Sequence, residues 1–348
     1  MAKLDKPQIN LARPTAARMW LVSLGALLGI IQSSLTDSGK SLIIGATAGL
    51  AALAAEALIY FRTDQAGTIK DGSAITSALI LTLFLPNTLH PVYGALGAVF
   101  AMTIVKHSFG GLGSNWLNPA VGGWLFVRFS CPAAFDTSLE NSMLVRIAES
   151  VQTGLADPEG SPLGLLKVAK AEYGPTIFDG FIRAFLRDGL FSLAKLEFPK
   201  GYSDLFNASA PGIIADRGIL ALLAGTILIS ASQVSRGWIP AVFLTCYLVL
   251  VRLFGALPFG GGFAKGDVFF GLFSGGVVPA AFLLAPDPST GPKSNLGALV
   301  SGALAGGGTF LFRYIGGEGY GAIFAIALLN CLVPVIRDLE SRKLYKTA

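Results

Sequence analysis

The sequence has little charge for its length. Asp, Glu, Lys and Arg together make up 14% of 348 residues, whereas a soluble domain usually carries about 25%. Hydrophobic residues make up 53%, and the mean hydropathy is +0.63. This composition excludes an ordinary soluble domain and predicts a membrane protein.

Side chains that bind metals are also scarce. The only histidines are His90 and His107, and the three cysteines, Cys131, Cys246 and Cys331, lie far apart and match no metal-ligand spacing. Basic residues form no run interleaved with aromatic residues, which argues against a nucleic-acid partner. We therefore expect no protein-ligated metal, and we interpret the net charge of +5 through membrane topology.

Long apolar segments dominate what is present. A helix needs about 20 apolar residues to cross the hydrocarbon core, and fewer where it is broken. We predict ten spans, at residues 18–35, 41–61, 73–86, 91–106, 118–130, 213–231, 238–255, 268–285, 296–314 and 320–336. The third, fifth and eighth are short or interrupted by glycine and proline.

Basic residues in the short loops predict the orientation. Ten spans put both termini on one side, which then holds thirteen Lys and Arg against six on the other. Lys106 counts toward the first side, and Arg217 and Arg313 toward the second. Because short cytoplasmic loops are enriched in these residues, we predict cytoplasmic termini in a bacterial inner membrane. The long connection 131–211 then lies outside, and loops of such length are usually functional.

Two parts of the chain resemble each other. Residues 83–111 and 283–317 each contain an apolar stretch, a proline-rich break, a span with Gly-Ala-Leu, and a basic-aromatic end followed by Gly-Gly. Five spans per half would give the halves opposite orientations, and inverted repeats place a site near the bilayer midplane. The alternative is chance similarity between spans rich in glycine and alanine.

The stretch KHSFGGLGSNWLNPAVGG, residues 106–123, breaks the apolar pattern. Irregular backbone at membrane depth is tolerated where it is buried in protein or lines a cavity. Asn118 before Pro119 favours a helix that begins there, and a helix start offers free N–H groups and a positive dipole end. The amides of Asn115 and Asn118 could then bind a flat polar ligand. The alternative is a tight cytoplasmic loop with a helix cap.

Three further polar residues lie in or beside predicted spans. Thr76 could line a cavity, or its hydroxyl could bond back to a carbonyl one turn earlier. Asp287, in APDPSTGP, is either a solvated turn residue or a partner for a ligand. Glu56 is an acid inside a predicted span, which makes it a candidate for an ion or proton pathway, although its side chain could instead reach toward water.

Residues 106–120 resemble the K-x-x-F-G-G-x-G-x-N-x-x-N-P-A motif of the RnfD/NqrB family. Residues 71–86 and 285–292 resemble two further segments of that family, in the same order. Its members are membrane subunits of the Rnf and sodium-pumping NADH:quinone oxidoreductase complexes. The similarity covers about residues 18–338, and the short N-terminal tail is more similar to RnfD.

The resemblance implies an all-α polytopic fold: about ten transmembrane helices in two inverted five-helix repeats with broken half-helices, similar to urea transporters. The expected organisation is an N-terminal cytoplasmic tail (1–17), a first repeat (18–130), a long external loop (131–212), a second repeat (213–338) and a C-terminal cytoplasmic tail (339–348).

The resemblance also implies flavins. The family attaches FMN by a phosphoester to a threonine in an S-G-A-T-P-L motif, and the best match is PEGSPL, with Ser161 at the threonine position. A plain turn is the alternative for this segment. A second, noncovalent flavin, such as riboflavin, is expected near Asn115, Asn118, Asp287 and Thr76. The family segment G-S-I-G-E-T-S corresponds to GIIADRG, residues 212–218, where Asp216 is the nearest acid.

The implied function is that of a membrane flavoprotein subunit of an Rnf-like ferredoxin:NAD oxidoreductase complex. It would carry electrons coupled to Na⁺ or H⁺ transport and would not be catalytic alone. Its expected partners are the other subunits, including a flavoprotein subunit on the external side. The residues alone leave another function open, a flavin-free channel or transporter of the urea-transporter kind, or a structural subunit.

Overall fold

The computed structural model describes residues 15–63, 71–111, 113–136, 212–232, 237–259, 263–264, 266, 268–292 and 294–346. Within these ranges the regular structure is helical, and the β-type pairing is one isolated antiparallel bridge between Pro86 and Ile213. Among the described residues, four long helical segments are apolar enough to cross a membrane: Ala16–Thr36, Lys40–Arg62, Asn295–Ile315 and Gly321–Arg342. The protein is therefore a multi-pass membrane protein.

The first group of helices follows the predicted spans closely. α1 is Thr15–Thr36, α2 Lys40–Thr63, α3 Ser73–Leu83, α4 Pro91–Phe100 and α5 Pro119–Ser130, with a short α6 at Ala133–Asp136. α4 continues without a break into the π-helix η2, Ala101–His107. π-helical turns are rare and are often found at functional sites.

The second group contains more breaks than the sequence predicts. It comprises α11 (Ile214–Arg217), α12 (Ile219–Ala231), α13 (Trp238–Phe254), η4 (Leu257–Phe259), α14 (Val268–Phe273), α15 (Val277–Pro279), η5 (Ala280–Leu284), α16 (Asn295–Phe310), η6 (Leu311–Ile315) and α17 (Gly321–Lys346). The predicted sixth span is split at Gly218. The last helix extends ten residues beyond its predicted end at 336 and passes through Pro334.

The break in the predicted eighth span has a clear backbone cause. Gly275 and Gly276 have φ values of 70° and 63°, in the left-handed region that favours glycine. A Cβ on Gly276 would lie 2.7 Å from a ring carbon of Phe84. The chain turns here because two glycines can adopt this conformation and leave room for the neighbouring side chain.

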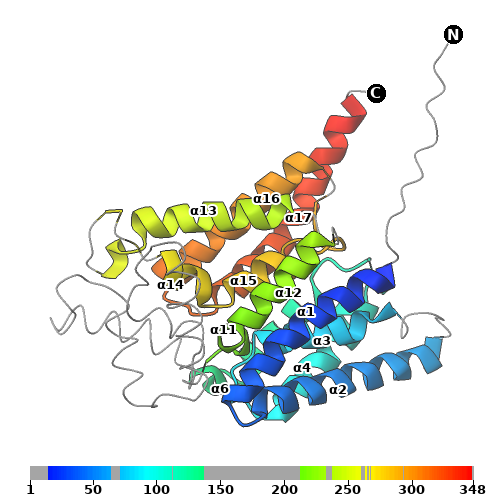
Figure 1. Cartoon of the computed structure of the whole chain (residues 1–348). Helices are drawn as coiled ribbons and strands as arrows, with labels where there is room; N and C mark the ends of the chain where they lie inside the picture. The colour runs from blue at the N-terminus through cyan, green and yellow to red at the C-terminus, as the bar shows by residue number, and fades with distance from the viewer. Residues whose placement is uncertain are drawn as a thin grey trace.

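α1 and α12 join the two groups. They lie side by side (Figure 1) and run antiparallel, because Gly25 contacts Gly225 while Gly29 contacts Gly218 and Leu222. A Cβ on Gly225 would lie 2.8 Å from the Cα of Gly25. The two helices approach closely because small residues leave their backbones bare.

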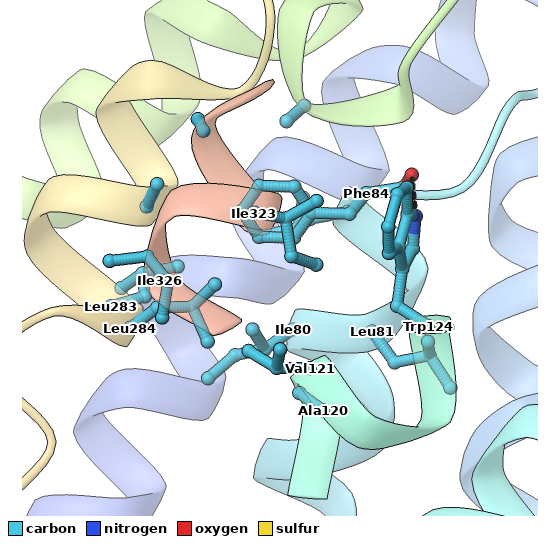
Figure 2. Packing of buried hydrophobic residues seen from close by; sticks show 14 of the residues in the cluster. Ile80, Leu81, Phe84, Ala120, Val121, Trp124, Leu283, Leu284, Ile323 and Ile326 are labelled. Carbon is cyan, nitrogen blue, oxygen red and sulfur yellow. Dashed lines mark hydrogen bonds between the residues drawn. The ribbon is translucent and has the colours of Figure 1, made fainter. Parts of the chain in front are cut away.

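The core draws on both groups. Figure 2 shows apolar side chains of α3, α5, η5 and α17 pointing toward one another. Trp124 of α5 is fully buried, and its Nε1 donates to the carbonyl of Phe84 at 2.8 Å. Large apolar side chains such as Leu50 and Phe61 are exposed on the outer surface, as expected where lipid is the solvent.

Candidate functional site

A cavity of about 230 Å³ lies at the end of the bundle where α1, α3 and α5 begin. We call this end the cavity face. The cavity walls come from both groups of helices, from α1, α3, η2 and α5 in the first and from α12, η5 and the segment after η5 in the second. All four predicted flavin-binding candidates line it: Thr76, Asn115, Asn118 and Asp287.

α5 begins at the cavity. Asn118 is extended, and its Oδ1 accepts from the N–H of Ala120 at 3.0 Å, with Pro119 in the first helical position. This cap confirms the predicted helix start. Asn118 is 7% exposed and lines the cavity, so the helix start is buried, while Phe109 and Trp116 in the preceding loop are exposed.

Asn118 and Asp287 contact each other directly. Asn118 Nδ2 donates to Asp287 Oδ2 at 2.8 Å. The same carboxylate accepts from Ser289 N at 3.1 Å and Oγ at 2.8 Å, and from Thr290 Oγ1 at 3.1 Å. Asp287 therefore orders its own turn and also binds Asn118 from the first group of helices.

The amide of Asn115 is held by backbone. With its nitrogen facing inward, it donates to the carbonyls of Lys106 and Gly111, each at 3.1 Å. The side chain is buried and lines the cavity. These bonds use both N–H groups, so its carbonyl oxygen is the atom left to accept from a ligand.

Thr76 connects α3 to α1. Its Oγ1 lies 2.9 Å from the carbonyl of Gly72, which is the predicted bond to a carbonyl one turn earlier. It also lies 2.8 Å from Ser23 Oγ and 3.1 Å from the carbonyl of Met19. The hydroxyl is already occupied, and Thr76 contributes to the cavity mainly by shaping its wall.

Lys106 and Glu56 form a buried ion pair beside the cavity. Lys106 Nζ lies 2.6 and 2.9 Å from the two carboxylate oxygens of Glu56 and 2.6 Å from Ser73 Oγ. The side chains are 1% and 0% exposed. The expectation that Glu56 reaches toward water is therefore wrong, because its carboxylate is satisfied inside the protein. An ammonium group has three N–H groups, and all three have partners here.

Arg18 brings a second cation to the cavity. Its Nε is buried and has no hydrogen-bond partner among the described residues, although the residue lines the cavity. A buried donor without a partner is costly, so this atom indicates where a ligand or water would accept. From the sequence, Lys106 was counted only toward one side of the membrane, because no local signal distinguishes a cation at the membrane surface from one that lines a cavity.

The second group also buries a basic residue in a π-helical segment. Arg313 lies in η6, is 1% exposed, and donates to Tyr247 Oη at 2.6 Å, to Ser274 Oγ at 2.7 Å and to the carbonyl of Gly271 at 3.0 Å. Each group thus buries one basic residue in a π-helical segment, Lys106 in η2 and Arg313 in η6. From the sequence, Arg313 was counted only toward one side of the membrane and was not identified as buried.

Asp216 has a structural task on the far side of the bundle. Its Oδ2 and Oδ1 accept from the N–H groups of Gly275 and Gly276, at 2.8 and 2.9 Å. The acid of GIIADRG therefore binds the break between α14 and α15. Arg217, which was counted toward the second side of the membrane, is 1% exposed and donates to Thr36 Oγ1 at 2.7 Å.

The predictions about Ser161 and about the cysteines concern residues away from the cavity. Ser161, with residues 137–211, lies outside the described residues. Cys131, Cys246 and Cys331 are free thiols, and the described residues contain no cluster of three His, Cys, Asp or Glu that could hold a metal.

Comparisons with known proteins agree with the motif. Residues 3–346 match the model of the NQR2, RnfD, RnfE family. The chain is 31% identical to the D-type subunit of the ion-translocating oxidoreductase complex of Escherichia fergusonii, over 98% of this chain and 97% of that protein.

Two relatives from other bacteria match over similar lengths. The chain is 27% identical to the D-type subunit of the proton-translocating ferredoxin:NAD(+) oxidoreductase complex of Clostridium ljungdahlii, over 95% of this chain and 92% of that protein. It is 25% identical to the D-type subunit of the Na(+)-translocating ferredoxin:NAD(+) oxidoreductase complex of Acetobacterium woodii, over 98% and 94%. The chain therefore belongs to the NQR2, RnfD, RnfE family.

Proposed function

We propose that this chain is the D-type subunit of an Rnf-like ferredoxin:NAD oxidoreductase complex, in which it carries electrons through bound flavin coupled to Na⁺ or H⁺ movement. Relatives that match nearly the whole chain are named as such subunits of ion-translocating oxidoreductase complexes. The observation that carries the proposal is the cavity, where the Asn115 and Asn118 motif meets Asp287 from the other group of helices.

The cavity suits a flavin. A flat ring system needs apolar walls and polar groups at its edge. Apolar side chains supply the walls: Met19, Val22, Ile80, Ile229, Phe282 and Leu283. The orphaned Nε of Arg18, the Asn115 carbonyl and the second N–H of Asn118 supply edge contacts. When bound, the flavin supplies the redox chemistry, and the protein supplies position and electrostatics.

The residues around the cavity have separable tasks in this proposal. Asn118 and Asp287 fix the polar edge and hold the two groups of helices together. The Lys106–Glu56 pair places buried charge next to the ligand, and Glu56 is our candidate for an ion or proton pathway because it lies at membrane depth. The apolar walls exclude water.

We further propose the finer architecture. Residues 18–130 and 213–338 would form two inverted five-helix repeats, with both termini and the cavity face on the cytoplasmic side of a bacterial inner membrane. The shared α-to-π transitions and the antiparallel contact of α1 with α12 support this. Residues 131–212 would form the external loop, with FMN attached at Ser161 and facing a flavoprotein subunit.

Flavin retention in the purified complex tests the proposal. Asp287→Asn keeps the size of the side chain and removes the charge that organises Ser289, Thr290 and Asn118, so noncovalent flavin per complex should fall at least fivefold. Asp338→Asn is the matched control, because Asp338 is exposed on α17 and pairs with Arg342. A wild-type complex that contains no extractable flavin would contradict the proposal and favour a flavin-free transporter.

A further inference from the structure

The last turns of α17 lie beyond the predicted span and extend past the neighbouring helices (Figure 1). Two side chains on these turns, Arg337 and Glu340, reach back to the segment between η5 and α16. They are three residues apart and so share one helix face. The end of α17 therefore holds a segment that belongs to the wall of the cavity.

Arg337 binds the carbonyls of that segment. Its Nε donates to Gly291 O at 3.0 Å, and its Nη2 donates to Ser289 O at 2.8 Å and to Gly291 O at 2.5 Å. A planar guanidinium with donors in a fixed fork suits two neighbouring acceptors, whereas a lysine ammonium offers a single point. The bonds therefore fix both the position and the orientation of residues 289–291.

Glu340 holds the far end of the same segment. Its Oε1 accepts from Ser294 N at 3.1 Å and from Ser294 Oγ at 2.5 Å. Ser294 is also the N-cap of α16, because its Oγ accepts from Gly297 N at 2.9 Å. The segment is thus tied to α17 at 289–291 and again at the start of α16.

Ser289 connects Arg337 to the cavity. Its carbonyl accepts from Arg337, while its N–H and hydroxyl both donate to Asp287. Asp287 in turn accepts from Asn118. The turn is tight, since a Cβ on Gly291 would lie 2.7 Å from the carbonyl oxygen of Asp287. A displacement of Ser289 would therefore move the carboxylate.

We propose that Arg337 is a positioning residue for the cavity: it locks Ser289 so that the Asp287 carboxylate stays aimed at Asn118 and at the ligand. The end of α17 thus controls the geometry of a site that it does not line. The ligand part of this inference rests on the proposed function, but the positioning part does not.

The test compares two arginines on one helix. Arg337→Gln removes the guanidinium group that donates to Ser289 and Gly291, whereas Arg342→Gln removes the same charge from an exposed pair with Asp338, at 2.9 Å. A spin label is attached to Pro288→Cys, an exposed residue, after Cys131, Cys246 and Cys331 are replaced by serine. Because Pro288 also lines the cavity, the label is read in assembled complex from which noncovalent flavin has been extracted, and flavin binding is measured in unlabelled complex.

We expect Arg337→Gln to raise the mobility of the label and to weaken noncovalent flavin binding at least threefold, while Arg342→Gln changes neither. Unchanged mobility in Arg337→Gln would overturn the inference. If the complex with Arg337→Gln fails to assemble, Arg337→Lys takes its place. We then expect label mobility between that of wild type and that of an unheld segment, and mobility equal to wild type would overturn the inference. Raised mobility with unaltered flavin content would support the positioning role and count against flavin in this cavity.

Discussion

Asn118 of α5 and Asp287 of the segment after η5 lie 169 positions apart in the sequence, yet they share a hydrogen bond of 2.8 Å. The bond joins the start of a half-helix in the first group to a turn in the second. It also places an amide and a carboxylate side by side in the wall of the cavity. The site therefore exists only when both groups are folded and docked.

Substitutions at Asn118 should separate its two tasks. Asn118→Ser keeps a capping hydroxyl but loses the amide that reaches Asp287, and Asn118→Ala loses both. Loss of a helix cap costs about 1 kcal/mol, and loss of a partner for a buried acceptor costs about 1–3 kcal/mol. Thermal unfolding in detergent should therefore rank wild type above Asn118→Ser, and Asn118→Ser above Asn118→Ala. Equal stability of Asn118→Ser and wild type would show that the bond to Asp287 contributes nothing.

The Lys106–Glu56 pair should behave as a unit. Removal of one member of a buried pair costs about 3–5 kcal/mol, whereas replacement of both is often far less harmful. We expect Glu56→Gln and Lys106→Met each to lower the unfolding temperature strongly, and the double variant to recover much of the loss. The four proteins form a double-mutant cycle, in which strictly additive effects would refute the coupling.

The contact between α1 and α12 should tolerate no added atoms. Gly225→Ala would place a methyl group 2.8 Å from Gly25 Cα and 2.9 Å from its carbonyl oxygen, and overpacking typically costs about 1–3 kcal/mol. Gly49→Ala on α2 is the control, since a Cβ there meets nothing within 4 Å. We expect only the first variant to lower thermal stability, and the reverse ranking would contradict the close approach.

Covalent flavin can be tested at Ser161 in a denaturing gel. If FMN is attached there as a phosphoester, the wild-type band fluoresces, Ser161→Ala abolishes the fluorescence and Ser161→Thr retains it, because threonine offers the same hydroxyl. Persistent fluorescence in Ser161→Ala would show that FMN is attached to another residue. A dark wild-type band would remove covalent FMN from the proposed function.

Local signals predicted several helix boundaries. Asn118 before Pro119 fixed the start of α5 to within a residue, because capping and the φ of proline depend only on neighbours. The glycines of the eighth span predicted an interruption, because the backbone freedom of glycine is also a property of the residue itself. The split at Gly218 was missed, since it depends on how closely α12 approaches Gly29, which is a tertiary contact.

The site was only partly predictable. The motif named Asn115 and Asn118, but Lys106, Arg217 and Arg313 were only counted toward one or other side of the membrane, and each is 1% exposed. Counts of basic residues describe the sides of a membrane and say nothing about depth. The partner of Lys106 is Glu56, fifty residues earlier, and no periodicity connects them.

The buried ion pair also constrains how the protein enters the membrane. α2 is synthesised with Glu56 before Lys106 exists, and an unpaired charged residue inside a lone spanning helix opposes insertion. Lys106 is synthesised only with the end of η2, and its ammonium group also donates a hydrogen bond to Ser73 at the start of α3. We therefore expect α2, α3 and the α4–η2 helix to settle in the bilayer together, so that one salt bridge sets the order of biogenesis for the first half of the chain.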